Sequence, residues 1–176
     1  MKRTHNCGKL RSENVAEKVT LCGWVDRRRD LGGIIFIDLR DKYGKTQVVF
    51  NPEHNSQVHK LADTLRNEFV IQITGTVQAR PEGMINEKLS TGTIDIMTDE
   101  LVIFNKAEPS PPAINDHNQV SKENDDVRLK YRYLDLRRPW NQQKILLKSK
   151  FLTHARAFFA EHDFEDIETP VLCKST

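Results

Sequence analysis

The sequence predicts a mainly β protein, in which a five-stranded barrel plugged by one helix is followed by a hinge and an incomplete α+β segment. Apolar residues recur at every second position in five short stretches, which is typical of half-buried strands. Between the third and fourth stretches the period changes to that of a helix. A polar stretch with three prolines then separates this region from a second, longer helical pattern.

Each predicted strand alternates apolar and polar residues. The five strands are residues 19–25, 34–40, 45–51, 69–79 and 93–104. Residues 41–44 join the second strand to the third as a hairpin. Residues 54–68 carry apolar side chains at helical spacing and are predicted to plug the end of the barrel. Three strands, a helix and two strands is the order of an OB-fold barrel, which we expect over residues 1–106.

The remaining residues are predicted to form a linker and the beginning of a second domain. Residues 107–126 have little apolar periodicity and are typical of a hinge. A helix is expected from about 141 to 162, and a short strand around Ile167 to Leu172. The expected apolar face of that helix contains Ile145, Leu152, Ala155 and Phe159. Because residues 127–176 stop before they could close a core, we expect partial disorder or non-native dimerisation there.

The composition is that of a soluble globular protein, with 38% hydrophobic and 30% charged residues among 176. A formal net charge of +2 gives no indication of a nucleic-acid partner, so a polyanion site would need local clustering. Three widely spaced cysteines without a CxxC pair argue against disulfides and structural zinc, and favour the reducing cytoplasm. No secretory signal, membrane span, metal-ligand spacing or complete catalytic motif is present.

The stretch WVDRRRDLGGIIFIDLRDKYGKTQVVF, at residues 24–50, carries the residues most typical of binding to unpaired bases. Such binding needs cations for phosphates, a flat ring for stacking and polar groups for base edges. Phe36 lies on the outward face of its strand, after a turn at Gly32-Gly33. Three consecutive arginines end the preceding strand: Arg27, Arg28 and Arg29. A run of charged residues or a single exposed ring is often only solvated surface. The prediction of a binding site therefore depends on the arginines and Phe36 lying close together.

Other polar residues could reach the same surface. Gln47 and Asp95 also face outward, and with Phe36 they fall on strands that would be adjacent in an OB-fold barrel. Arg80 and Asn86 lie in the 80–92 loop. Taken singly, each could be an ordinary solvated side chain, but their coincidence on adjacent strands favours a binding site.

Four strings together resemble the aspartyl-tRNA synthetase family of the bacterial type. They are the 24–50 stretch quoted above, LRNEFVIQITGTVQAR, RLKYRYLDLRRP and DIETPVLCKST, and they extend over almost the whole chain. The related asparaginyl and lysyl enzymes share the barrel but resemble the RRRD stretch less. The resemblance implies an N-terminal domain that reads the GUC anticodon, joined to the beginning of a class II catalytic domain.

Carried over by motif, the resemblance implies a role for each residue of the surface. Phe36 would stack on an anticodon base, and Gln47 would bond the central uracil with support from Arg29. Arg80 and Asn86 would approach the third base, and Asp95 would contact the first. The family usually has Glu at the place of Asp95, which is one methylene shorter.

The resemblance also implies partners and cofactors. Leu31 and Gly83 lie where the family chooses between tRNA-Asp alone and tRNA-Asp with tRNA-Asn, and the two residues point to opposite choices. The helix from 141 and the Thr169-Pro170 segment resemble motif 1, so Pro170 would lie at a homodimer interface. The full-length enzyme would use ATP and Mg2+ to activate aspartate. The 176 residues alone should bind no cofactor and be inactive, because the ATP-holding motifs 2 and 3 are absent.

Two other functions remain open from the sequence. The chain could be a stand-alone, non-enzymatic OB-fold module that binds tRNA or single strands. Alternatively, the apolar helix from 141 could simply drive self-association. The last of the four strings ends within motif 1, which favours the ligase over the stand-alone module and over simple self-association.

Overall fold

The computed structural model describes residues 3–111, 114, 124–172 and 174. The chain divides into two compact units, Met1–Ser110 and Pro111–Thr176, and each is described by itself. Most of the predicted 107–126 linker, together with Cys173, falls outside the described residues. The domain boundaries at 106 and 127 therefore stay predictions.

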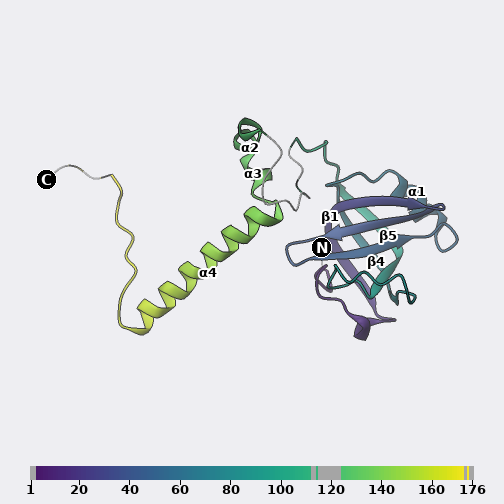
Figure 1. Cartoon of the computed structure of the whole chain (residues 1–176), viewed down its shortest axis with the longest axis horizontal. Helices are drawn as coiled ribbons and strands as arrows, with labels where there is room; N and C mark the ends of the chain where they lie inside the picture. The colour runs from purple at the N-terminus through teal and green to yellow at the C-terminus, as the bar shows by residue number, and fades with distance from the viewer. Residues whose placement is uncertain (1–2, 112–113, 115–123, 173, 175–176) are drawn as a thin grey trace. The chain divides into compact units, whose positions relative to one another are not determined.

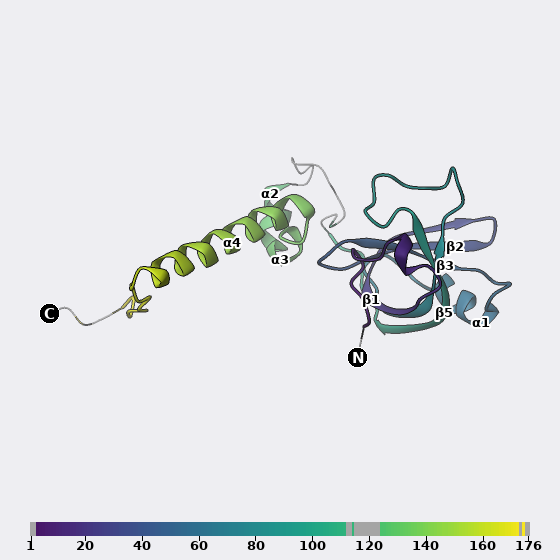
Figure 2. The same cartoon turned by 90° about the horizontal axis from the view of Figure 1, so that it is seen from below.

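The first unit is a closed five-stranded barrel, which confirms the predicted fold (Figure 1). Its strand order is β1-β2-β3-β5-β4. The strands are β1 Lys18–Leu31, β2 Ile34–Arg40, β3 Lys45–Phe50, β4 Val70–Ala79 and β5 Ile94–Asn105. A short 3-10 turn, Ser12–Asn14, precedes β1, and helix α1, Ser56–Asp63, lies between β3 and β4. Figure 2 shows the connection from β4 to β5, in teal, extending from the barrel as a long loop.

The barrel interior is filled by the side chains that the alternation placed on inward faces. On β2 the inward residues Ile35, Ile37 and Leu39 are fully buried, and the outward ones are half-buried. Val49 is an exception, because it lies on the same outward face of β3 as Gln47 and is nonetheless buried. Phe50 is the largest fully buried side chain among the described residues. Most of the barrel core thus follows from apolar periodicity, to which Cys7 and Leu10 from the segment before β1 are added.

Helix α1 is shorter than the predicted 54–68 segment. Asn55 caps its N-terminus, where its Oδ1 accepts a hydrogen bond from the Val58 amide at 3.1 Å. The helix ends at Asp63, but Leu65 and Phe69 still bury their side chains in the core. The apolar spacing therefore predicted correctly which segment is buried, but it overestimated the length of the helix.

Strand β1 is longer than predicted because a β-bulge lets it continue through the arginine run. Val25 pairs with Leu39 and Arg27 with Asp38, so Asp26 is an extra residue in β1. Simple alternation from Val25 would have turned Arg27 and Arg29 toward the interior. Since cross-strand partners share a face, the bulge instead brings Arg29, opposite Phe36, onto the outward face.

Asp26 is held at the bulge by two cations. It is 4% exposed, and its carboxylate lies 3.1 Å from Arg40 Nη1 and 2.6 Å from Lys45 Nζ. Arg40 also donates to Glu68 at 2.7 Å, which ties the start of β4 to the same cluster. A buried carboxylate costs free energy unless it is paired, so this cluster fixes the bulge in place.

The barrel closes along one short parallel contact. Strands β3 and β5 pair through Val48 with Ile96 and Val49 with Met97. The other strand pairs are antiparallel and have longer ladders. A hydrogen bond of 2.6 Å from Thr91 Oγ1 to the Lys45 carbonyl adds to this seam.

The second unit consists of helices. They are α2 Asp125–Lys130, α3 Arg132–Asp135 and α4 Pro139–Glu161. Asp135 is fully buried, where it accepts hydrogen bonds from Arg132 Nη1 at 2.7 Å and from Asn141 Nδ2 at 3.1 Å. Arg128 and Arg138 also lie within ion-pair distance of Asp135, so this carboxylate fastens the beginning of α4.

The predicted helix from 141 to 162 is confirmed, with differences in its surroundings. No residue of α4 is buried, and exposed apolar side chains occur on more than the one expected face. They include Leu146, Leu147, Phe151 and Phe158 in addition to the predicted Ile145, Leu152 and Phe159, whereas Ala155 is half-buried. None of the described helices has the length and apolar character needed to cross a membrane.

The predicted strand around Ile167 to Leu172 is wrong. Residues 164–172 have no strand, and Val171 is 97% exposed. A strand requires a neighbour for its backbone hydrogen bonds, and no described strand pairs with this segment. The apolar alternation alone therefore could not produce a strand here.

The bulge cluster should contribute strongly to barrel stability. Asp26→Ala leaves Arg40 and Lys45 without their shared carboxylate, and we expect it to lower the free energy of unfolding by about 3 kcal/mol. Urea denaturation followed by Trp24 fluorescence measures this, in a Trp140→Phe background because Trp24 and Trp140 are the two tryptophans. The exposed Asp63→Ala should cost less than about 1 kcal/mol. Equal losses in both variants would contradict a special role for the bulge.

Candidate nucleic-acid interface

One hollow on the barrel brings together most of the residues predicted to bind. It has a volume of about 510 Å³. Its lining residues are Arg29, Leu31, Phe36, Gln47, Arg80, Met84, Asn86 and Asp95. They come from β1, β2, β3, β5 and the loop between β4 and β5, and all except Met84 were predicted site residues.

The β1–β2 turn sets one edge of the hollow. Gly32 and Gly33 have φ angles of 63° and 82°, a pair that a tight hairpin turn requires and that side chains disfavour. The turn leaves Leu31 at the rim with 61% of its surface exposed. Met84 from the β4–β5 loop is 69% exposed and lines the same hollow. Two apolar side chains thus stand at the rim of a mostly polar site.

Arg29, Asp38 and Gln47 form a hydrogen-bonded group beside Phe36. Arg29 Nη2 donates to Asp38 Oδ1 at 2.7 Å and to Gln47 Oε1 at 2.9 Å. Asp38 and Gln47 are also directly opposed in the β2–β3 ladder. The amide of Gln47 is therefore oriented by its neighbours rather than solvated as an isolated surface group.

Arg80 and Asp95 form the second polar group. Arg80 Nε donates to Asp95 Oδ1 at 2.7 Å and to the Ile94 carbonyl at 3.1 Å. The Arg80 side chain is 4% exposed, and its buried Nη2 has no hydrogen-bond partner among the described residues. An unpaired buried N–H is costly, so this atom is suited to donate to an acceptor on a ligand.

Burial raises the pKa of Asp95 above its ordinary value, while the Arg80 guanidinium works in the opposite direction. The folded barrel therefore binds a proton at Asp95 more tightly than the unfolded chain does. The ionised carboxylate costs stability at neutral pH, and that cost is relieved as the pH falls through the raised pKa.

Asn86 has a structural part in the β4–β5 loop in addition to its place in the hollow. Its amide donates to the Gly92 carbonyl at 3.0 Å, and its Oδ1 accepts from the Lys88 amide at 3.1 Å. A Cβ at Gly92 would lie 1.9 Å from the Asn86 carbonyl oxygen, so only glycine allows this closure. The side-chain Nδ2 of Asn86 makes no hydrogen bond within the described residues.

Four predicted residues are not brought into the hollow. The guanidinium of Arg28 lies 2.5 Å from Asp63 at the end of α1. Arg27 is exposed and makes no ion pair with the described residues. Gly83 lies in the β4–β5 loop with φ 86° but does not line the hollow, and Pro170 is an exposed residue of the second unit.

Two contributors were missed by the sequence reasoning. Asp38 shares the outward face with Phe36, so strand parity already placed it near the site, but its hydrogen bond to Arg29 required the bulge. Met84 is one of three large apolar residues in the loop, with Ile85 and Leu89, so its residue type alone did not distinguish it.

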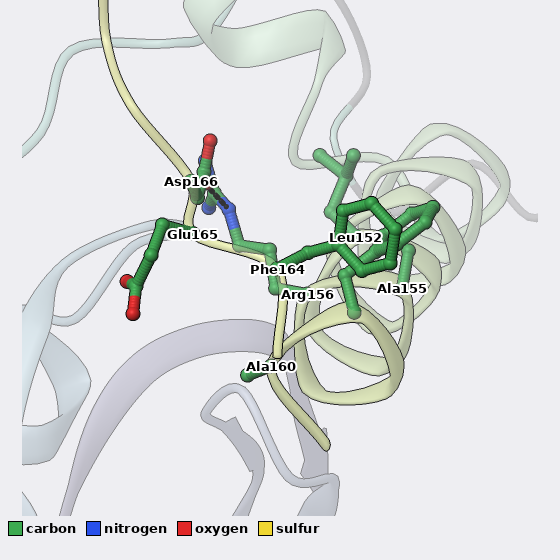
Figure 3. Close-up of a pocket in the computed structure, with 8 residues that line it drawn as sticks. Leu152, Ala155, Arg156, Ala160, Phe164, Glu165 and Asp166 are labelled. Carbon is green, nitrogen blue, oxygen red and sulfur yellow. Dashed lines mark hydrogen bonds and ion pairs between the residues drawn. The ribbon is translucent and has the colours of Figure 1, made fainter. Parts of the chain in front are cut away.

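A second cavity, of about 640 Å³, lies in the C-terminal unit between α4 and the residues that follow it (Figure 3). Its lining residues are Leu152, Ala155, Arg156, Phe159, Ala160, Phe164, Glu165 and Asp166. Arg156 Nε donates to Asp166 at 2.8 Å, which holds the chain back against the helix. The lining is largely apolar and suits protein packing more than chemistry.

Comparison with known proteins matches each unit to a known family. Residues 19–104 match the OB-fold nucleic acid binding domain, and residues 124–176 match the tRNA synthetases of class II (D, K and N). An Aspartate--tRNA(Asp/Asn) ligase of Desulfatibacillum aliphaticivorans is 54% identical over 176 residues, all of this chain and 29% of the relative. The chain belongs to the aspartate–tRNA ligase family. It corresponds to the N-terminal part, an OB-fold anticodon domain with the start of a class II catalytic domain.

Other members of the family agree with this assignment. A ligase of the same name from Ruthia magnifica is 49% identical over 174 residues, or 99% of this chain and 29% of the relative. The chain thus spans less than a third of the length of these aspartate–tRNA ligases. The family resemblance inferred from the four strings is confirmed.

Solved structures of synthetases share the fold. The aspartyl tRNA synthetase from Entamoeba histolytica covers 98% of this chain with a TM-score of 0.83 and 22% identity, over 40% of its own length. The asparaginyl-tRNA synthetase from Pyrococcus horikoshii, complexed with asparaginyl-adenylate, covers 97% with a TM-score of 0.79 and 23% identity, over 37% of its length. At these identities the likeness concerns the fold alone.

The environment of Asp95 can be checked by titration. Carboxyl ¹³C NMR should give Asp95 a pKa above the ordinary value for aspartate, and Arg80→Met should raise that pKa further because the guanidinium favours the ionised form. Asp99 on the same strand is a matched control. The hydrogen bond from His54 lowers the pKa of Asp99, so its contribution to stability is lost only as the pH falls through that lowered value. An Asp95 that titrates below Asp99 would contradict the described burial.

Proposed function

We propose that the barrel recognises the anticodon arm of tRNA-Asp, and that the hollow beside Phe36 receives anticodon bases. The observation that carries this proposal is the convergence of a ring, an oriented amide and a carboxylate–guanidinium pair in one hollow of about 510 Å³. These are the groups that read unpaired bases. The names of the relatives, Aspartate--tRNA(Asp/Asn) ligase, support tRNA-Asn as a second substrate.

Phe36 and the polar lining residues each have a role in this proposal. The Phe36 ring stacks on a base, and Gln47, held by Arg29, hydrogen-bonds the central uracil. Asp95 contacts the first base and Arg80 the third, with Asn86 beside it. Because Arg80 and Asp95 are joined at 2.7 Å, the contacts to these two bases are coupled. An ionised Asp95 carboxylate suits the amino and imino donors of guanine, since it only accepts hydrogen bonds.

The three consecutive arginines have different roles under this proposal. Arg29 orients Gln47, and Arg28 is engaged with Asp63 on α1. Arg27 is the exposed member without a described ion-pair partner and is best suited to a phosphate. Leu31 at the rim is placed to affect the choice between the two tRNAs. Gly83 could act on that choice only through the conformation of the β4–β5 loop.

We further propose that these residues work within a full-length aspartate–tRNA ligase, which activates aspartate and transfers it to tRNA. The 29% coverage of the relatives supports this. Among the described residues no three His, Cys, Asp or Glu side chains gather to hold a metal ion. We propose that the chemistry with ATP and Mg2+ belongs to the full-length enzyme, and that the 176 residues alone have no ligase activity.

The second unit is proposed to form part of a homodimer interface in the full-length enzyme. The exposed apolar side chains of α4 and the largely apolar cavity beside Phe159 support burial against another copy. Pro170, in the segment that follows, is part of the same proposal. The free Cys7 and Cys22 fit a reducing compartment, so we place this function in the cytoplasm.

The anticodon proposal is tested by fluorescence-anisotropy titration with a GUC stem-loop. Phe36→Ala removes the stacking surface and should weaken binding by roughly 1–3 kcal/mol. Tyr43→Ala is the matched control, because Tyr43 is an exposed ring outside the hollow, and it should leave the affinity unchanged. If GUC and base-changed loops bind alike and Phe36 has no effect, the barrel is a generic polyanion binder.

The assignment of Arg27 to a phosphate predicts a salt effect. Arg27→Gln should weaken binding of every loop by a similar factor and reduce the slope of log K against log salt by about 1. Arg28→Gln should change that slope less, because Asp63 already neutralises its charge. Titrations at several salt concentrations measure both slopes. A larger change from Arg28 than from Arg27 would reverse the assignment.

A further inference from the structure

Asp38 is a carboxylate next to the hollow that the roles above leave without a function. It is largely buried, lies opposite Arg27 in one ladder and opposite Gln47 in the other, and shares the outward face with Phe36. Its Oδ1 accepts from Arg29 Nη2 at 2.7 Å. Asp38 does not line the hollow, so its influence on a ligand would pass through Arg29.

The same Arg29 nitrogen connects Asp38 to Gln47. Nη2 donates to Gln47 Oε1 at 2.9 Å while it donates to Asp38. An amide has one acceptor oxygen and one amino group, and here the oxygen is engaged by the guanidinium. The amino group of Gln47 is then the part of the side chain available to a base. Asp38 fixes Arg29, and Arg29 fixes which end of the amide is presented.

A presented amino group discriminates between bases by their edges. The 4-position of uracil is a carbonyl, which accepts a hydrogen bond. The 4-position of cytosine is an amino group, which donates and would meet a second donor. Arg29 can only donate as well, so a base with an amino group at this position finds no acceptor on this side of the hollow.

We propose that Asp38 is a positioning residue for base discrimination, which locks the Arg29–Gln47 pair in a donor-presenting state that selects a keto base over an amino base. This inference rests on the proposed function of the hollow. It predicts that Asp38 governs the ratio of affinities for two bases more than the affinity for either one.

The test compares GUC and GCC stem-loops by fluorescence anisotropy on the full 176-residue chain. The unaltered chain should bind the GUC loop about tenfold more tightly, and Asp38→Ala should reduce that ratio to about threefold or less. A free Arg29 gains attraction for phosphate, so the absolute affinities can rise. Asp63→Ala is the matched control, because Asp63 pairs with the neighbouring Arg28 away from the hollow, and it should keep the ratio.

A second variant tests the polarity of the amide directly. Gln47→Glu keeps an oxygen for Arg29 and replaces the presented amino group with an acceptor oxygen. The preference should then shift at least about fivefold toward the GCC loop relative to the unaltered chain. This change reports on polarity and is independent of the overall affinity.

The outcomes separate the inference from the function beneath it. If the unaltered chain distinguishes the loops and Asp38→Ala keeps the full ratio, the inference fails and anticodon reading stands. If Asp38→Ala weakens both loops equally and lowers the melting temperature, the residue is merely structural and the inference also fails. If the unaltered chain does not distinguish the loops, both are overturned.

Discussion

The β-bulge at Asp26 is the constraint on which the outward face of the barrel depends. One extra residue in β1 reverses the alternation, so that Arg29 lies opposite Phe36 rather than in the core. The extra residue is a buried acid whose charge is satisfied by Arg40 and Lys45. Arg40 also pairs with Glu68, two residues before β4 begins. The ion cluster that stabilises the fold is thus also what determines the composition of the hollow.

Charge is distributed differently between the hollow and its rim. Inside, Arg29 is paired with Asp38 and Arg80 with Asp95, so the two cations are compensated by two carboxylates. Outside, Arg27 is exposed. Compensated pairs contribute hydrogen-bond geometry rather than net attraction, and an exposed cation contributes attraction without selectivity. A net charge of only +2 is therefore compatible with nucleic-acid binding, because selectivity comes from the paired groups and attraction from the exposed cation.

Periodicity predicted the barrel well because its core is a direct consequence of alternation. The strands 34–40 and 45–51 and the outward position of Phe36 followed from it. The bulge could not be predicted, since Asp26 is one more polar residue in an already polar run. The end of β1, the ion pair of Arg28 with Asp63 and the hydrogen bond from Arg29 to Asp38 all depend on the bulge. At the C-terminal end, the prediction of a strand at 167–172 was wrong. A strand needs hydrogen bonds to a neighbouring strand, and the local alternation of apolar residues does not show whether such a neighbour exists.

The short β3–β5 seam gives the hollow a mechanical property. Gln47 and Asp95 belong to the two strands that meet there, and only two residue pairs join these strands in register. Fluctuations that open a barrel begin where the ladder is shortest, so these two side chains should separate before others do. A ligand that contacts both Gln47 and Asp95 would hold β3 and β5 together. Ligand binding and closure of the barrel would then be thermodynamically linked, so that ligand binding would stabilise the closed barrel and opening of the barrel would weaken ligand binding.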